Sequence, residues 1–178
     1  RLGTVDRRHS CGTCHCDARS CNGHWGIIEL PLPVVHVAFV EIVRKVLSIV
    51  CISCSRLRLS NEELAKWPVE HLQSASSRKA RLTNIYSTCR VRKICPHCSS
   101  PAPMYMRTPM CTIEVDWSGV SDKLFFSDEE RACLVDEPFD TRTVYKIMKD
   151  ITDDDATVMG FDVKVTHPKS FILHALAV

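Results

Sequence analysis

The residues best suited to chemistry in this chain are cysteines and histidines at the spacing of metal ligands. A two-residue spacer lets one tight turn present two ligand atoms to the same ion. Four such groups complete the tetrahedral shell of structural zinc. The chain has three Cys-x2-Cys steps and one Cys-x2-His step. We therefore expect two structural zinc ions, one held by Cys11, Cys14, Cys21 and His24 and one held by Cys51, Cys54, Cys95 and Cys98.

Both predicted sites are closed, since four protein ligands leave no coordination position for a substrate or water. Their expected role is to replace the core that polar loops lack. Zinc in small finger domains contributes on the order of 10 kcal/mol or more to folding. A redox-active Cys-x2-Cys step would open a helix, whereas Cys51 follows a predicted one. The other cysteines are expected to be small buried thiols: Cys16, Cys89, Cys111 and Cys133.

Motifs of catalysis are missing from the sequence. It contains no glycine-rich phosphate loop, no nucleophile elbow and no His-Glu-x2-His step. The three adjacent acids Asp153, Asp154 and Asp155 suggest a magnesium site at first sight, but they more often favour the N-terminus of a helix. We expect no reaction from this chain by itself.

Charge divides the chain unevenly, although the net charge is only +2. Residues 1–113 carry 16 Lys and Arg against 7 Asp and Glu, a difference of +9, and residues 114–178 carry 7 against 14, a difference of −7. We predict a basic zinc-binding domain over 1–113 and an acidic α+β domain over 114–178. A basic surface attracts nucleic acid, and a merely solvated basic face fits the charge equally well. The cations that could face phosphates are Arg78, Lys79, Arg81, Arg90, Arg92 and Lys93.

Hydrophobic periodicity predicts an α+β fold with a few helices, a small antiparallel sheet and irregular loops stapled by zinc. The strongest helix prediction covers 34–50. Its polar residues form one wet stripe, which a membrane-spanning helix would not carry: Glu41, Arg44, Lys45 and Ser48. Further helices are expected from the capping box at Ser60, over 78–89, over 141–151 and over 153–159. Strands are expected at 27–30, 111–117 and 123–126, and after the turn at His167-Pro168.

The ends of the chain look cut. It starts at Arg1 without a methionine and ends on the apolar run 171–178, so we expect a piece of a longer protein. No signal peptide is visible, and eleven cysteines is an odd number. A disulfide-rich extracellular domain is the competing interpretation, and it predicts no bound metal.

Residues 1–58 closely resemble a known family. Three strings carry the resemblance beside the ligands: Arg1-Leu2-Gly3, then Trp25-Gly26-Ile27-Ile28-Glu29-Leu30-Pro31, then Pro33-Val34-Val35-His36-Val37-Ala38-Phe39. They are similar to the N-terminal clamp region of the largest subunit of eukaryote-type, RNA polymerase II-like DNA-directed RNA polymerases. Residues 86–95, 139–160 and 167–178 continue the resemblance more loosely, and 60–80 and 99–135 depart from it. The string Gly23-His24-Trp25-Gly26 and the compact second ligand set look more like the enzyme of a large DNA virus.

The resemblance implies a mobile clamp that closes over DNA and holds the DNA–RNA hybrid. The parent enzyme would be a nucleotidyltransferase whose magnesium-binding acidic loop lies far downstream, so magnesium is not expected to bind here. The implied partners are the other polymerase subunits, especially the second-largest, together with DNA, the hybrid and transcription factors, and no membrane. The implied location is the nucleus for a cellular enzyme, and the virion or a cytoplasmic viral factory for a viral one.

One further alternative belongs to a different class. Four ligand pairs in order could cross-brace two ions, as in the RING domains of freestanding interaction modules. In that case Cys11 and Cys14 would share an ion with Cys51 and Cys54. The six-residue gap before Cys21 argues against it, since a short loop more readily wraps one ion than spans two.

Overall fold

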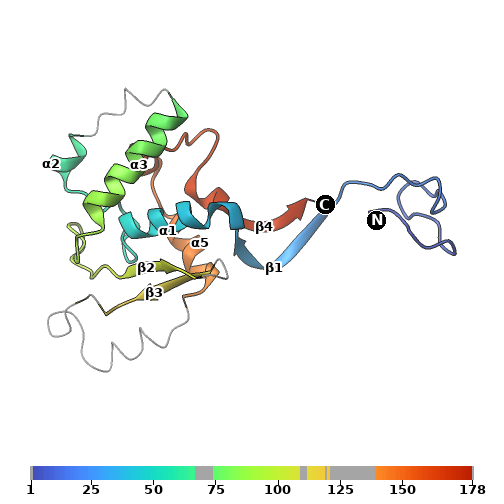
Figure 1. Ribbon diagram of the computed structural model, residues 1–178, viewed down its shortest axis with the longest axis horizontal. Helices are drawn as coiled ribbons and strands as arrows, with labels where there is room; N and C mark the ends of the chain where they lie inside the picture. The colour runs from blue at the N-terminus through green and yellow to red at the C-terminus, as the bar shows by residue number, and fades with distance from the viewer. Residues whose placement is uncertain (1, 67–73, 109–111, 119, 121–138, 178) are drawn as a thin grey trace. The chain divides into compact units, whose positions relative to one another are not determined.

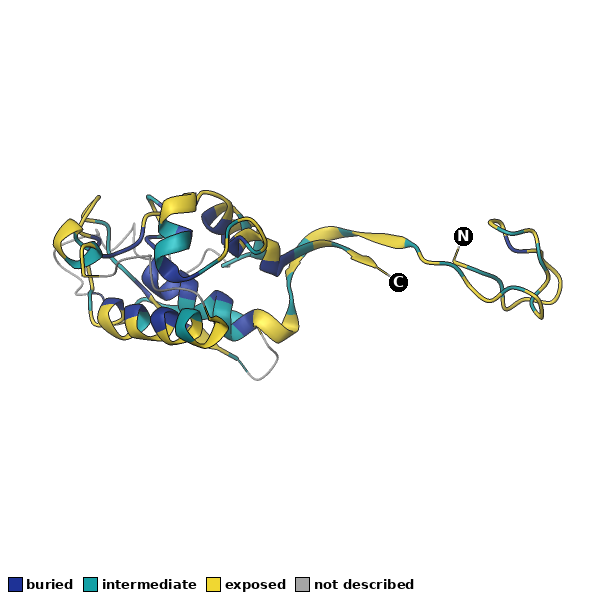
Figure 2. Cartoon of the chain, turned by 90° about the horizontal axis from the view of Figure 1, so that it is seen from above, coloured by how far each residue is buried: buried dark blue, intermediate teal, exposed yellow. Residues whose placement is uncertain are grey.

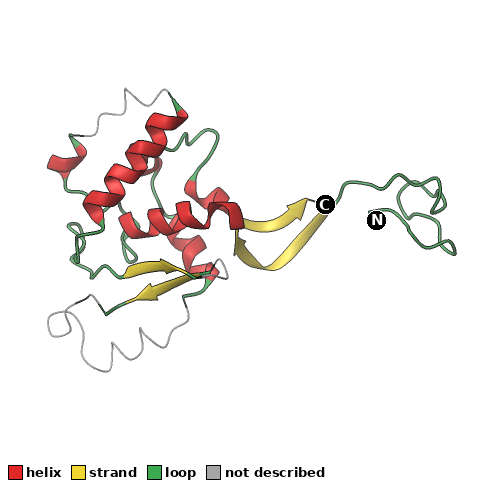
Figure 3. Cartoon of the chain, in the orientation of Figure 1, coloured by secondary structure: helices red, strands yellow, loops and turns green. Residues whose placement is uncertain are grey.

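The computed structural model describes residues 2–66, 74–108, 112–118, 120 and 139–177. The described residues form helices and two small two-stranded sheets, which confirms the predicted α+β class (Figure 3). The chain divides into two compact units, one of residues 1–34 with 173–178 and one of residues 35–172. The predicted boundary at residue 113 falls inside the second unit.

The first unit contains the first ligand set and most of a two-stranded sheet of β1 (Ile27–Val35) and β4 (Ile172–Ala177). Of residues 2–34 only Cys11 is buried (Figure 2). Pro31 and Pro33 lie within β1. Each lacks a backbone N–H, and a two-stranded sheet accepts this because each of its strands has one unpaired edge. Loops and a ribbon with so little buried apolar surface cannot be stabilised by hydrophobic burial alone.

The second unit is built around α1 (Val40–Ile49), which is coloured cyan in Figure 1. This helix packs against α3 (Ala75–Cys89), α5 (Thr141–Lys149) and the strand β2 (Met104–Arg107). Its apolar residues recur every three or four positions, so they form one buried face. The buried apolar side chains of α1 are Val40, Val43, Val46, Leu47 and Ile49.

The predicted helix over 34–50 begins later than expected. Val34 and Val35 belong to β1, and a short 3-10 turn, η1 (Val37–Phe39), precedes α1. His36 caps this turn, because its ring accepts a hydrogen bond from the N–H of Ala38 at 3.2 Å. Ser48, expected on the wet stripe, is buried and donates its hydroxyl to the carbonyl oxygen of Arg44 at 2.8 Å.

Side-chain caps set the other helix starts. The capping box forms at α2 (Asn61–Leu64), where the N–H of Ser60 donates to Glu63 at 2.9 Å. In α3 the Ser74 hydroxyl accepts from the N–H of Ser77 at 3.1 Å. The predicted helix over 141–151 is present as α5, which ends at Lys149. Its predicted inner residues are buried, Ile151 lying just after the helix: Val144, Ile147, Met148 and Ile151.

The three adjacent acids form the first turn of α6 (Asp153–Met159), as predicted. Thr152 caps this turn, and Gly160 ends the helix with a left-handed backbone at φ 97°. The carboxylate of Asp155 accepts a hydrogen bond from the N–H of Leu57 at 3.2 Å, which ties α6 to the segment after Cys54. A place in the first turn of a helix thus accounts for these residues.

The predicted strand over 111–117 is present as β3 (Ile113–Asp116), and its partner is β2, which the sequence did not indicate. The pair is antiparallel, with Met104 opposite Asp116 and Arg107 opposite Ile113. The predicted strand over 123–126 lies outside the described residues, as does Pro68, and α2 ends at Leu64. The 3-10 turn η3 (Pro168–Phe171) leads into β4, as expected at His167-Pro168. Within the described residues, no helix has the length and apolar character needed to cross a membrane.

Candidate metal centres

Three turns of this chain share one backbone geometry, and each contains a Cys-x2-Cys step. In each turn the N–H of the first cysteine (Cys11, Cys51 or Cys95) donates to the carbonyl oxygen five residues later, at 2.8–2.9 Å. Its own carbonyl oxygen accepts from the N–H four residues later, at 2.9–3.0 Å. This fold of the backbone points the two sulfurs of each step toward one position.

The residue directly after each step has a left-handed backbone. These residues are His15 at φ 59°, Ser55 at φ 54° and Ser99 at φ 59°. They are the only non-glycine residues with positive φ in the part of the chain that the structure describes. A side chain disfavours this conformation, so the hydrogen bonds of the turn must compensate for the strain.

The first cluster joins Cys11, Cys14, Cys21 and His24, whose ligand atoms all lie within 4.8 Å of one another. Cys21 Sγ and His24 Nε2 are 3.5 Å apart. The N–H groups of Cys14 and Thr13 point at the Cys11 sulfur and lower the pKa of Cys11 to about 6. The thiolate is the form that binds metal, so this backbone prepares Cys11 as a ligand.

The second cluster joins Cys51, Cys54, Cys95 and Cys98, again with all ligand atoms within 4.8 Å. Cys54 Sγ lies 3.8 Å from Cys95 Sγ, and Cys51 Sγ lies 3.4 Å from Cys98 Sγ. Sulfurs about 2.3 Å from a tetrahedral zinc ion are about 3.8 Å apart, so the cluster fits that ion. Burial raises the pKa of Cys51 to about 12. A bound cation reverses that preference by stabilising the thiolate.

His97 lies between the two cysteines of the last turn and fastens it to the turn before. Its Nε2 is 3.0 Å from the carbonyl oxygen of Leu57, a residue that follows the Cys51–Cys54 turn. The two halves of the second cluster, separated by 40 residues of sequence from Cys54 to Cys95, are therefore held together by protein contacts as well.

The geometry disagrees with both alternative interpretations of the cysteines. Cys11 and Cys14 meet Cys21 and His24 and not the Cys51–Cys54 step, so the RING-like cross-brace is wrong. The nine cysteines among the described residues are free thiols, and the sulfur separations above exceed the ~2.0 Å of a disulfide bond. The disulfide framework is therefore not formed among them.

The cysteines outside the clusters differ from the ligands. Cys16 is half-buried and its thiol points at the carbonyl oxygen of Cys14, 3.5 Å away. Cys89 is buried in the core, and burial raises its pKa to about 11, which makes it a poor nucleophile. Cys111 and Cys133 lie outside the described residues.

The six predicted phosphate-facing cations occupy two separate places. Arg78, Lys79 and Arg81 lie near the start of α3, where Lys79 is exposed and Arg81 is buried. The other three lie at the end of α3 and just after it: Arg90, Arg92 and Lys93. About 18 Å of helix separates residue 78 from residue 90 at 1.5 Å per residue. The burial of Arg81 leaves little of its guanidinium for a phosphate.

Arg58 is a functional candidate that the sequence did not indicate. It is only 3% exposed, and it donates to the carbonyl oxygens of Ser48, Arg92 (3.1 Å) and Cys89 (3.3 Å). No carboxylate among the described residues lies within ion-pair distance of it. Burial lowers the pKa of Arg58, and the nearby groups Cys89, Tyr105, Cys51 and Cys95 act on it in the opposite direction. Four thiolates around zinc carry a formal charge of −2, so Arg58 is the buried cation suited to balance the second cluster.

Comparison with known proteins relates this chain to one family. All of residues 1–178 match the family described as RNA polymerase Rpb1, domain 1. The chain is 28% identical over 188 aligned residues to DNA-directed RNA polymerase II subunit RPB1 of Euplotoides octocarinatus, and it covers 37% of that protein. It is 30% identical to DNA-directed RNA polymerase subunit Rpo1N of Thermococcus celer and to that of Methanothermobacter thermautotrophicus, covering 19% and 18% of them. The whole chain aligns each time, so it spans between about a fifth and two fifths of these relatives.

Proposed function

The chain belongs to the RNA polymerase Rpb1 domain 1 family, and from this premise we propose that it forms part of the clamp in the largest subunit of a multisubunit DNA-directed RNA polymerase. The observation that carries the proposal is the match over the full chain, together with two four-ligand clusters in one piece of protein. In this proposal the parent enzyme adds nucleotides at a magnesium site elsewhere. The present segment helps to retain DNA and the DNA–RNA hybrid.

The proposed cofactors are two structural zinc ions, one in each cluster. The donors fit zinc: three thiolates and an imidazole in the first, and four thiolates in the second. Zinc would supply a fixed tetrahedral centre that fastens loops otherwise lacking a core. All four ligands come from protein in each cluster, so neither ion would bind a substrate.

Metal content tests the two sites, with a matched control in the same loop. The zinc-loaded chain should contain two zinc ions, and Cys21→Ser and Cys98→Ser should each contain one. Cys16→Ser should keep both, because Cys16 is not among the four residues whose ligand atoms converge and its thiol points at the carbonyl oxygen of Cys14. Loss of zinc from Cys16→Ser, or a parent chain without zinc, would contradict the assignment of one zinc ion to each cluster.

We further propose that cations on and after α3, each exposed or half-buried, contact the phosphates of nucleic acid. The residues proposed are Arg78, Lys79, Arg90, Arg92 and Lys93. Contacts of this kind do not depend on sequence, and each phosphate neutralised releases condensed counterions. Their strength therefore falls as salt rises.

The salt dependence of DNA binding by the assembled enzyme tests this surface. Neutralising the five cations to Gln should lower the slope of log affinity against log salt by about 0.9 for each duplex phosphate that these side chains neutralise in the parent enzyme. A matched control neutralises Lys146 and Lys149, which are exposed on α5. Equal slopes for the two variants would mean that the proposed surface is ordinary solvated charge.

The wider partners follow from the proposed place in the enzyme. We propose that the segment assembles with other polymerase subunits, including the second-largest, and with transcription factors. The cellular or viral source, and with it the nucleus or a viral factory as its location, stay predictions.

A further inference from the structure

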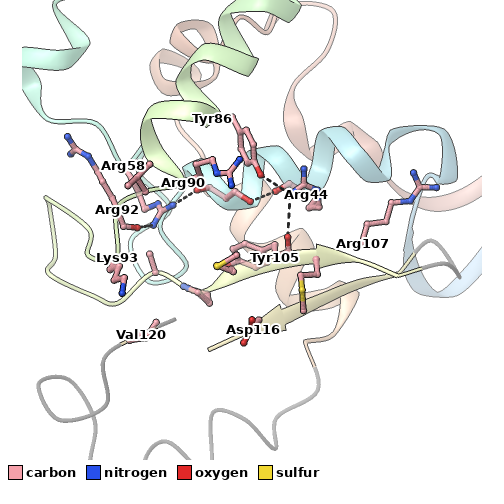
Figure 4. A pocket seen from close by; sticks show the side chains of 16 residues that line it. Arg44, Arg58, Tyr86, Arg90, Arg92, Lys93, Tyr105, Arg107, Asp116 and Val120 are labelled. Atoms are coloured by element: carbon pink, nitrogen blue, oxygen red, sulfur yellow. Dashed lines mark hydrogen bonds between the residues drawn. The ribbon is translucent and has the colours of Figure 1, made fainter. Parts of the chain in front are cut away.

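A basic pocket of about 620 Å³ opens in the second unit, between α1, the end of α3 and β2 (Figure 4). This volume lies within the range of ordinary ligand pockets. Segments far apart in the sequence build it, including residues 90–93 and 102–107. Its charged lining consists of six cations and one acid: Arg44, Arg58, Arg90, Arg92, Lys93, Arg107 and Asp116.

Among the described residues, cations outnumber acids in the lining of this pocket. Arg44 pairs with Glu41 at 2.6 Å, and Arg92 pairs with Glu63. In the described part of the chain, Arg90 and Lys93 have no carboxylate within ion-pair distance, and both are exposed. The side chains of Arg90 and Lys93 can therefore pair with an anionic ligand.

The same pocket has an exposed apolar lining. Val91 is 77% exposed, Met104 is 54% exposed and Met106 is 47% exposed. Methionine is unbranched and polarisable, so thioether surfaces adapt to different apolar side chains. Ala102 and Pro103 extend this apolar surface. The ligand should therefore present an apolar group beside its negative charge.

The aromatic rings of the lining offer little room for a nucleobase. The guanidinium of Arg44 lies 5.2 Å from the centre of the Tyr86 ring, and that of Arg90 lies 5.9 Å from it. Tyr105 is only 5% exposed. Strands of nucleic acid bind by stacking bases on free aromatic faces, and these faces are occupied or buried. An aliphatic or aromatic side chain fits the methionine and valine lining better.

We propose that this pocket binds an acidic peptide segment of a partner protein, which inserts one apolar side chain and pairs its carboxylates with Arg90 and Lys93. The anchor contacts Val91, Met104 and Met106. The flanking carboxylates meet Arg90 and Lys93, and charge complementarity selects acidic partners. This inference goes beyond the clamp role and does not depend on it.

Fluorescence anisotropy with the full, zinc-loaded chain tests the pocket. The probe is a fluorescein-labelled peptide of aspartates around one central phenylalanine. Replacing the phenylalanine of the probe by serine should weaken binding about tenfold or more, as expected for a buried anchor. The double variant Met104→Thr with Met106→Thr should weaken binding of the parent probe by a similar factor, because it removes apolar lining. Threonine is chosen because strands accept it. Lys93→Glu should weaken binding of the parent probe more at low salt than at high salt, because salt screens the lost charge interaction.

Three controls make the result decisive. Lys79→Glu changes the same charge outside the pocket and should leave peptide binding within about twofold, as screening between distant exposed charges predicts. Melting curves check that the methionine variant stays folded. A labelled oligothymidine should be insensitive to the methionine substitutions. No peptide binding, equal binding of the serine probe, or loss of oligothymidine binding in the methionine variant would each overturn the proposal.

Discussion

At the scale of single residues, the metal ligands and the strained positions beside them follow one rule. Each Cys-x2-Cys step is followed by a left-handed residue, and in this chain that residue is His15, Ser55 or Ser99. Glycine would adopt this backbone without a steric cost. The sequence therefore tolerates strain at all three turns, where backbone hydrogen bonds and the expected metal hold the conformation.

Replacing Ser99 by glycine should stabilise the protein. Ser99 is exposed, so the change removes strain at φ 59° without opening a cavity. The expected gain in the free energy of unfolding is about 0.5–1 kcal/mol, which is the left-handed penalty less the greater entropy of an unfolded glycine. Thermal melting of the zinc-loaded protein measures it. Ser53→Gly is the control, because Ser53 is exposed in the Cys51–Cys54 turn and its φ is negative. A lower melting temperature for Ser99→Gly than for Ser53→Gly would contradict the prediction.

The ligand residues were predictable because their signal is local. Two-residue spacers indicate each turn, and the short gap before Cys21 favours one ion. Arg58 gave no such signal, since its neighbours Leu57 and Leu59 form an ordinary apolar alternation. Arg58 is a candidate because of its burial, which depends on how distant segments pack.

At the scale of elements, helix ends were harder to predict than helix faces. The apolar spacing identified the buried side of α1 and α5, but the start of α1 was misplaced by six residues, from Val34 to Val40. Apolar residues continue through the end of β1, so periodicity alone did not show where the strand stops. The β2 strand was missed because it is four residues long and follows a proline at Pro103.

The C-terminal end of α6 is a place where one residue type is required. Gly160 has φ 97°, and a Cβ there would lie 3.0 Å from the carbonyl oxygen of Arg78 in α3. Gly160→Ala should therefore lower the free energy of unfolding by more than about 1 kcal/mol, since both the left-handed backbone and the close helix contact oppose a side chain.

Chemical denaturation of the zinc-loaded chain measures this effect. Gly12→Ala is the matched control, because a Cβ on Gly12 meets nothing within 4 Å and its φ is not in the left-handed region. Equal stabilities of the two variants would show that α6 can move away from α3 at little cost.

At the scale of the whole molecule, the two units are stabilised in different ways. Residues 2–34 contain one buried side chain, Cys11, whereas the second unit has a continuous core that includes Leu47, Ile85 and Met148. If the proposed zinc ions bind, metal binding would therefore supply most of the folding free energy of the first unit. In the second unit it would add to hydrophobic burial.

Removing metal should unfold the units unequally. Cys21→Ser should lose backbone protection in 2–34 while the amides of α1 remain protected from hydrogen exchange, because the α1 core is built without the first cluster. Hydrogen exchange read by mass spectrometry on the zinc-loaded variant measures both regions. Cys98→Ser is the comparison and should loosen the segments next to the second cluster. Unchanged protection of 2–34 in Cys21→Ser would contradict the assignment of its metal-dependent fold.

The pairing of β1 with β4 brings the two ends of the segment 36–171 together, so that this segment has the topology of an inserted domain. Everything from His36 to Phe171 is enclosed between two strands of one ribbon, and the N–H of His36 donates to the carbonyl oxygen of Phe171 at 2.9 Å. The two splice points are thus neighbours in space, the arrangement in which domain grafting is best tolerated. A chimera that carries the corresponding segment of an archaeal relative would need only these two junctions, and natural divergence of the insert can proceed without disturbing the ribbon that frames it.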